Sequence, residues 1–235
     1  MTFDEVMNEL EAMGSEQTKK IFTRHGAREP LFGVKVGDLK KIVKKIKKDH
    51  DLSLKLFDSG NSDAMYLAGL IADENKITKK QLQTWADKAY WYMISEYTVA
   101  WVTAESPYGH ELGKEWIESD EERIASAGWA TLSNLAAIKS DDELDIKELD
   151  TLLDRISKTI NHAPNRVRYT MNGFVIAVGS YVSELTDRAI EIGEKIGKVD
   201  VKMGGTACKV PSSPEYIQKV KDKGRLGKKR KVARC

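Results

Sequence analysis

The sequence predicts an all-α chain that folds as a curved solenoid of stacked antiparallel helix pairs and continues into an irregular basic tail. Apolar residues recur at helical spacing along almost all of residues 1–197, and strand-like alternation is scarce. The expected helices are about 10–18 residues long with short connections, which is typical of stacked pairs rather than of a four-helix bundle. The sequence has no strict internal period, so the repeats of the solenoid are expected to be degenerate.

The first helices have clear boundaries. Thr2 and Glu5 have the spacing of a capping box, and apolar residues follow at helical intervals. A second helix is expected over 15–25, where Gly26 ends it. A third is expected over 38–49, with one apolar face and one cationic face. The cationic face consists of Lys41, Lys44, Lys45 and Lys48.

The remaining helices follow from periodicity and from capping residues. Thr78 and Asp142 are typical N-caps, whereas Gly60 and Gly197 are typical stops. The expected helices lie near 52–58, 62–73, 78–92, 95–104, 108–118, 121–138, 142–160, 164–181 and 185–197.

The composition changes after Gly197. We therefore expect a helical domain over 1–197 and a basic, largely irregular extension over 198–235. One short helix is expected from Pro214 to Lys221, and the last dozen residues are expected to be extended and mobile. Gly204-Gly205-Thr206 has the composition of a plain turn, although such a loop can also hold a phosphate.

The composition excludes several classes of protein. Hydrophobic residues make up 41% and charged residues 31% of the 235 residues, with 5 Pro, which excludes collagen-like, disulfide-stapled and largely disordered chains. No apolar run is long enough to span a membrane, and the acidic start does not resemble a signal peptide. We therefore expect a cytoplasmic protein with Cys208 and Cys235 reduced. The histidines and cysteines lack the spacing of metal ligands, so neither a metal nor a cofactor is expected.

The net charge of +2 conceals a strong asymmetry. Residues 199–235 carry a net charge of +8, and the other 198 residues carry −6. A concentrated basic end indicates contact with a polyanion, and a nucleic-acid backbone supplies closely spaced anions. The alternative is a solvated tail. The candidate DNA-binding residues of the tail are Arg225, Lys228, Lys229, Arg230 and Lys231.

Aromatic residues are the next candidates. The 5 tryptophans are expected to pack in the core for the most part, but adjacent positions of the Tyr90-Trp91-Tyr92 cluster cannot all face one core. At least one of these rings is therefore expected to face a groove. Glu96 follows closely, and a carboxylate beside aromatic rings can stabilise a developing cation. The alternative for Glu96 is a surface glutamate.

Three sequence blocks resemble the DNA alkylation repair family of HEAT-like repeat proteins. They are Leu31–Ile42, Asp49–Phe57 and Ala64–Asp73, and the similarity continues through Ala127-Gly128-Trp129 to about residue 197. The resemblance implies a HEAT-like solenoid whose concave basic face holds duplex DNA. It also implies excision of N3- and N7-alkylated purines, with aromatic rings and an aspartate beside the cationic deoxyribose.

The residues that the resemblance makes catalytic are mostly substituted here. The family's Trp-x-x-x-Asp pattern falls on Trp91 and Ser95, and its arginine falls on Ser126. The tryptophan and arginine of a later helix fall on Gly173 and Ile176. The remaining catalytic candidates are Trp91, Tyr92 and Glu96, and Glu96 needs a shift of helical register to replace an aspartate at position 95.

From these observations we expect a monomeric protein that binds duplex, damaged or branched DNA on a concave basic face. Two alternatives stay open. One is an active N3/N7-alkylpurine glycosylase with a divergent site, so the enzymatic activity is undecided. The other is a helical scaffold that binds proteins.

Overall fold

The computed structural model describes residues 1–204 and 208–234, and every regular element in them is helical. The all-α prediction is therefore confirmed for this part of the chain. The α-helices are α1 (Phe3–Met13), α2 (Glu16–Arg24), α3 (Val36–Ile46), α4 (His50–Asp58), α5 (Ser62–Ile71), α6 (Lys79–Lys88), α7 (Ala100–Glu105), α8 (Gly109–Trp116), α9 (Glu122–Ile138), α10 (Ile146–Thr159), α11 (Asn165–Tyr181), α12 (Thr186–Ile196) and α13 (Ser213–Asp222). The short elements are η1 (Met93–Val99), η2 (Asp141–Glu143), η3 (Ile160–His162) and η4 (Ser183–Leu185).

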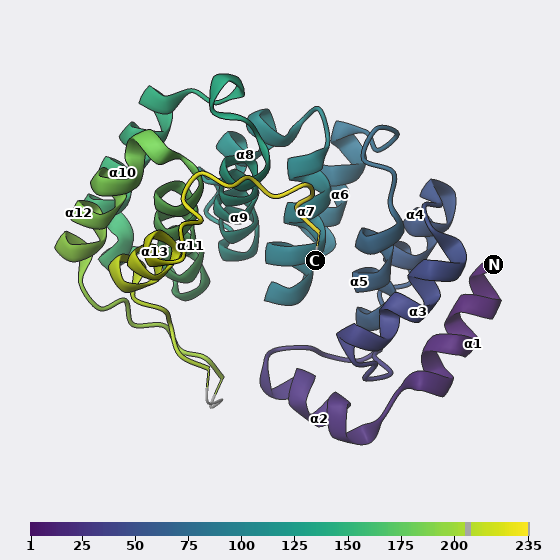
Figure 1. Ribbon diagram of the computed structural model, residues 1–235. Coiled ribbons are helices and arrows are strands. Elements are labelled where there is room, and N and C mark those ends of the chain that lie inside the picture. Colours follow the sequence, from purple (N-terminus) through teal and green to yellow (C-terminus); the bar gives the residue numbers. More distant parts are fainter. Residues whose placement is uncertain (205–207, 235) are drawn as a thin grey trace.

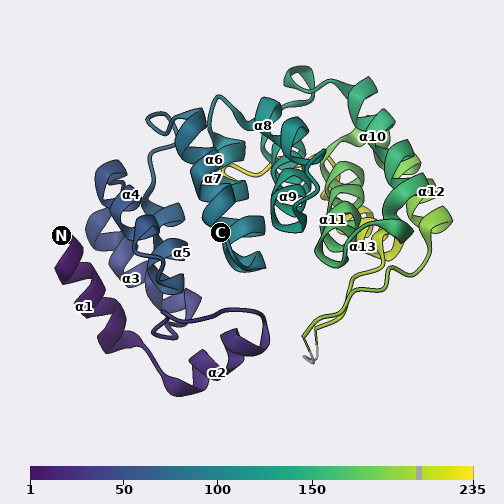
Figure 2. The same ribbon diagram turned by 180° about the vertical axis from the view of Figure 1, so that it is seen from behind.

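The helices form an open arch with two rows. Figure 1 shows α5, α7, α9 and α11 along its inner side and α4, α6, α8, α10 and α12 along its outer side. The inner row is continuous, because α5 and α7 both pack against η1, α7 packs against α9, and α9 packs against α11. Most inner helices also pack against an outer partner, as α9 does against α8 and α11 against α12. Figure 2 gives the same arrangement from behind. The concave side of the arch is therefore lined by consecutive inner helices.

Most of the predicted helix boundaries are confirmed. Thr2 accepts from the Glu5 backbone N–H in a complete capping box, and Thr78 caps α6 in the same way. Gly60 and Gly197 follow their helices at φ 69° and 67°, which L side chains rarely adopt. Asp142 is not a helix cap, however. It lies in the short turn η2, and Asp145 caps α10 instead, because its carboxylate reaches the backbone N–H three residues on.

The predicted helices over 78–92 and 95–104 differ most from the observed ones. α6 ends at Lys88, and the chain then forms the π-helix η1 over Met93–Val99 before α7 begins. A π-helix closes i→i+5 hydrogen bonds and so contains one more residue per bonded turn than an α-helix. The register of residues 93–99 is therefore shifted relative to the α-helix expected from the sequence.

One continuous apolar core runs between the two rows of helices. Trp85, Trp101, Trp116 and Trp129 are all at most 3% exposed, as expected for core packing. Trp85 stacks on Phe57 with ring centroids 4.2 Å apart. No helix in the described part of the chain is both long and apolar enough to cross a membrane.

The C-terminal tail packs against the body, in contrast to the predicted mobile end. Figure 1 shows it crossing from α13 to α7 over the front of the arch. It meets the C-terminal ends of four inner helices in succession. Gly227 N donates to Ser180 O of α11, and Arg230 N donates to Ala137 O of α9. Ala233 is fully buried, and its backbone N–H donates to Glu105 at the end of α7.

The tail ends in an arginine clamp near α5. Arg234 donates to the carbonyl of Ala72 at 2.8 Å and pairs with Glu74 and Glu105 at 2.8 and 2.9 Å. Helix C-termini have unpaired carbonyls and a partial negative charge, so cations are stabilised there. The basic end of the tail therefore stabilises the fold by pairing with the C-terminal end of α5 and with two carboxylates.

The segment between α12 and α13 projects from the arch toward its open side (Figure 1). Lys202 and Met203 belong to its described part. Gly205 and Thr206 of the predicted glycine-rich turn lie outside the described residues, as does Cys235. The boundary between residues 197 and 198 stays a prediction, although α13 packs against both α11 and α12.

Candidate functional site

The most distinctive polar group on the inner side of the arch is a buried ion pair between Arg166 and Glu96. Arg166 Nε and Nη2 donate to the two carboxylate oxygens of Glu96 at 2.8 and 2.5 Å. The guanidinium carbon also lies 4.3 Å from the ring centre of Tyr92 and 4.4 Å from that of Tyr169. The arginine is thus held by a carboxylate and by two aromatic rings, both of which attract a cation.

The spacing of exposed residues on α11 shows which of them face the concave side of the arch, which we call the groove. Arg166, Tyr169, Gly173 and Ile176 are spaced at i, i+3, i+7 and i+10. All four are partly exposed, whereas most of the residues between them are buried. Positions with this spacing form one stripe along a helix, so this stripe is the solvent-facing side of an inner helix.

Glu96 is not a surface residue. Only 5% of it is exposed, and burial raises its pKa to about 7 although Arg166 beside it lowers the value. The ionised carboxylate is neutralised by the guanidinium, and the protonated form has no charge. In either state the site offers no uncompensated negative charge to a cationic sugar.

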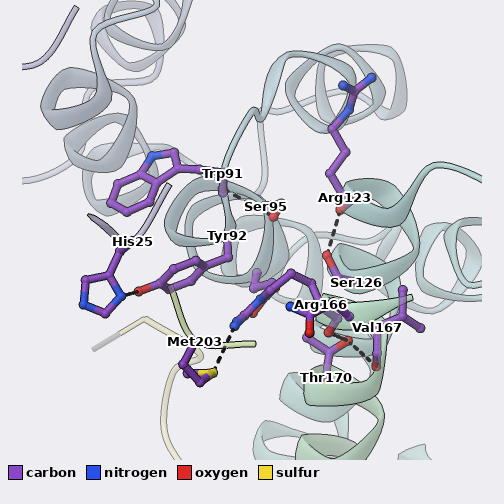
Figure 3. Close-up of polar contacts among 12 residues, drawn as sticks. His25, Trp91, Tyr92, Ser95, Arg123, Ser126, Arg166, Val167, Thr170 and Met203 are labelled. Atoms are coloured by element: carbon purple, nitrogen blue, oxygen red, sulfur yellow. Dashed lines mark hydrogen bonds and ion pairs between the residues drawn. The ribbon is translucent and has the colours of Figure 1, made fainter. Parts of the chain in front are cut away.

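Tyr92 faces the groove, as expected for at least one ring of its cluster. Its hydroxyl is 3.0 Å from His25 Nδ1, and burial raises its pKa. Figure 3 shows Tyr92 and Arg166 directed toward each other, with His25 and Met203 beside them. A cavity of about 200 Å³ lies here between the end of α2 and the segment before α13. Its lining consists of Arg24, His25, Gly26, Tyr92, Arg166, Lys202, Met203 and Gly204.

This cavity contains cations and aromatic surface but no metal cluster. The described residues include no group of three or more His, Cys, Asp or Glu side chains that could bind a metal ion. Arg24 and Lys202 are exposed at the rim. The arrangement is suited to an anion that carries a ring, which is the chemistry of a nucleotide.

Trp91 lies behind this site rather than in it. It is 7% exposed, its Nε1 donates to Ser62 Oγ at 3.0 Å, and its ring packs on Phe22 and Tyr92. Ser95 is 1% exposed, and its hydroxyl points back to the Trp91 carbonyl. The family's Trp-x-x-x-Asp position is therefore a buried packing position in this chain.

The other positions implied by the resemblance are equally unreactive. Ser126 is 1% exposed and donates to the backbone of Arg123. Gly173 has no heavy atom within 4 Å of an ideal Cβ, so the groove is open where the family has a tryptophan. Ile176 is partly exposed on the same stripe. None of the three supplies a charge.

The lysine face predicted on the third helix is mostly paired. Lys45 Nζ is 2.7 Å from Glu9 of α1, and Lys48 Nζ is 2.5 Å from Glu74. Lys41 pairs with Asp38 at 2.8 Å. Among the described residues only Lys44 of this face lacks an ion-pair partner, so three of the four charges are locally compensated.

The tail cations divide into two groups. Lys229 turns inward, where its ammonium donates to Ala136 O at 2.9 Å and pairs with Asp141 at 2.7 Å. Arg230 is partly buried and donates to Ala233 O. Arg225, Lys228 and Lys231 are exposed. The tail is therefore not a uniform cationic arm.

Arg166 and Tyr169 are not among the site residues predicted from the sequence. Their i, i+3 spacing on a helix is a local signal that they share a face. Their meeting with Tyr92 and Glu96 joins residues about 70 positions apart, and no local pattern predicts that contact.

The chain is similar to a known protein family, to two bacterial proteins and to one solved structure. The model of the family described as DNA alkylation repair enzyme matches residues 6–204. The uncharacterized proteins Lmo0209 of Listeria monocytogenes and Lin0241 of Listeria innocua are 38% and 37% identical over 229 residues, covering 95% of this chain and 99% of each relative. A solved structure with 40% identity and a TM-score of 0.92 covers 100% of both chains. It represents a new family of proteins related to the HEAT-like repeat DNA glycosylases, with affinity for branched DNA structures.

Proposed function

Because the chain belongs to the DNA alkylation repair enzyme family, we propose that it is a member that binds branched DNA in the groove of the arch without excising bases. The similar solved structure, from a family with affinity for branched DNA, supports the choice of ligand. The buried ion pair in the groove supports the absence of chemistry.

The single observation that carries this proposal is that the Glu96 carboxylate is already paired with the Arg166 guanidinium. Excision of a cationic purine develops positive charge on the deoxyribose, and a nearby carboxylate has to stabilise it. Glu96 makes two hydrogen bonds to one guanidinium and is 5% exposed. Removing one such stabilising charge typically costs about 10²–10³-fold in rate.

The rim of the cavity supports DNA binding. Arg24 and Lys202 are exposed and line the same cavity as the Tyr92 ring. Cations that contact phosphates release counterions, and aromatic faces stack on bases without sequence preference. Such contacts recognise the shape and charge of DNA rather than its sequence. Branched DNA differs from linear DNA in shape, so contacts of this kind suit it.

Two assays test the proposal together. Excision is measured on duplex DNA that carries N7-methylguanine or N3-methyladenine, and affinity is measured for a three-way junction and for a linear duplex of equal length. We expect no excision above the uncatalysed rate, tighter binding of the junction, and weaker binding after Arg24→Gln and Lys202→Gln. Substitution of Lys147 and Lys158, which are exposed on the outer helix α10, is the matched control. Rapid excision, or equal affinity for both DNAs, would contradict the proposal.

A glycosylase that uses Glu96 is the second candidate, and the π-helix favours it. The π-helix supplies the register shift that Glu96 needs to replace residue 95. DNA binding would then have to displace Arg166. In that case Glu96→Gln should reduce excision by about 10²-fold or more while the affinity for DNA stays within about twofold, because binding depends on separate phosphate contacts.

A further inference from the structure

A second cationic pocket lies outside the groove, between the end of α11, α13 and the tail. Its volume is about 350 Å³, within the usual range for a site that takes a small ligand. Its lining consists of Ser180, Tyr181, Tyr216, Lys219, Val220, Lys223, Arg225, Lys228 and Arg230. The lining thus contains five cations, two tyrosines and no carboxylate.

Four of the five cations of this pocket have no carboxylate partner among the described residues, whereas Lys41, Lys45 and Lys48 in and after α3 are paired. Within residues 1–204 and 208–234, none of Lys219, Lys223, Arg225 and Lys228 has a carboxylate within ion-pair distance. All four are exposed. Like charges held together by a fold repel one another, so they gain most from a polyanion.

The two tyrosines indicate what kind of anion fits. Tyr216 is 48% exposed and is one of the few large hydrophobic side chains that are exposed in the described part of the chain. Tyr181 is half-buried on the adjacent wall. Ser180 also lines the pocket, and its buried hydroxyl has no hydrogen-bond partner among the described residues. Cations beside aromatic faces match a phosphate linked to a flat ring, as in single-stranded DNA.

The position of the pocket relates it to the groove. It lies on the face of the arch that the tail crosses, beside the inner helix α11 (Figure 1). A duplex held in an arch passes through the plane of the arch and emerges at its two faces. A strand that separates from this duplex at a fork would leave it on the side of α13.

We propose that this pocket binds an unpaired nucleotide of a DNA arm that leaves the groove. The cations contact the phosphodiester groups, and the Tyr216 ring stacks on the base. The inference rests on the proposed function, since it requires the rest of the branched DNA to occupy the groove. Beyond the proposed function, the pocket would give the protein a preference for DNA with a single-stranded arm, and the pocket residues would bind that arm.

The test compares three DNAs that share one duplex sequence: a blunt duplex, a forked duplex with one unpaired arm that carries 2-aminopurine, and a fully paired four-way junction. Affinities are measured by fluorescence anisotropy for the full chain and for two variants, Tyr216→Ala and the double variant Lys219→Gln with Lys223→Gln. Lys147→Gln with Lys158→Gln on α10 is the matched control. Thermal unfolding confirms that each variant is folded.

We expect each pocket variant to weaken binding of the forked DNA by about fivefold or more, with the blunt duplex changed by less than about twofold. The 2-aminopurine signal of the bound fork should be quenched in the wild type and restored by Tyr216→Ala. Equal loss for the fork and the paired junction would overturn the proposal, because the pocket would then take a duplex backbone. Unchanged affinity for the fork would overturn it as well. A wild type that binds none of the three DNAs would instead refute the proposed function, and this inference with it.

Discussion

Arg234→Met tests whether the basic tail is part of the fold or an arm for DNA. Arg234 is 10% exposed and bridges Glu74 and Glu105, which are 17% and 11% exposed. Methionine keeps the volume and removes the charge and the hydrogen bond to the Ala72 carbonyl. The two carboxylates would then lie close together without the guanidinium between them.

The expected loss of stability follows from these contacts. Removing one partner of a buried ion pair costs about 3–5 kcal/mol. The lower end applies here, because Glu74 keeps Lys48 at 2.5 Å and Glu105 keeps the backbone N–H groups of residues 233 and 234 at 2.7 and 3.1 Å. We therefore expect a decrease of about 3 kcal/mol in the free energy of unfolding, or about 6–12 °C in Tm for a chain of this size.

The assay is urea unfolding monitored by the tryptophan fluorescence of the core. Lys231→Met, an exposed position in the same tail, is the control and should change the free energy of unfolding by less than about 0.5 kcal/mol. A double-mutant cycle with Glu105→Gln should give a coupling energy above about 1 kcal/mol. A free energy of unfolding for Arg234→Met within 1 kcal/mol of the wild type would refute the reasoning and return the tail to the role of a solvated arm.

Three further predictions concern packing, DNA contact and pH. Gly69→Ala should lower the free energy of unfolding by about 1–3 kcal/mol in urea titrations, because the new Cβ would lie 2.6 Å from Thr98 Cγ2, whereas Gly173→Ala, with no atom within 4 Å, should be neutral or stabilising. Lys44→Gln should reduce the slope of log K against log salt for DNA by about 0.9 if this exposed lysine contacts a phosphate, and an unchanged slope would exclude the contact. Glu96 has a folded-state pKa of about 7, above its ordinary value of 4.5, so its contribution to stability is complete below pH 4.5 and is lost as the pH rises through 7. The stability of the wild type relative to Glu96→Gln should therefore fall by up to about 3 kcal/mol across this window, and parallel pH profiles of the two proteins would contradict the raised pKa.

The sequence alone determined the helical class and most helix ends of this protein. The reason is that those features depend on local physics. Apolar spacing specifies which side of a helix is buried, and side chains such as Thr2 and Thr78 satisfy backbone groups only a few residues away. Asp142 was misassigned as a cap because Ser140 and Asp145, two equally suitable residues, flank it.

The residues of the groove were only partly accessible to sequence reasoning. Tyr92 was expected to face a groove from the geometry of adjacent positions, and it does so. The burial of Glu96 was not foreseen, because its partner Arg166 lies 70 residues away and the register of its segment depends on a π-helix. Without knowledge of its partner, Glu96 is predicted to be either a catalytic carboxylate or a surface residue. Paired with Arg166 in the interior, it is a buried structural group.

Only the tertiary structure decided which cations are free. From the sequence, Lys45, Lys48 and Lys229 are predicted DNA contacts and Arg234 belongs to the same basic tail, whereas Lys219 and Lys223 are not singled out. The fold brings acids or helix ends to the first four and leaves the last two in solvent beside Tyr216. The energy of a charge depends on its neighbours within a few ångströms, and in this chain those neighbours come from helices that are distant in sequence.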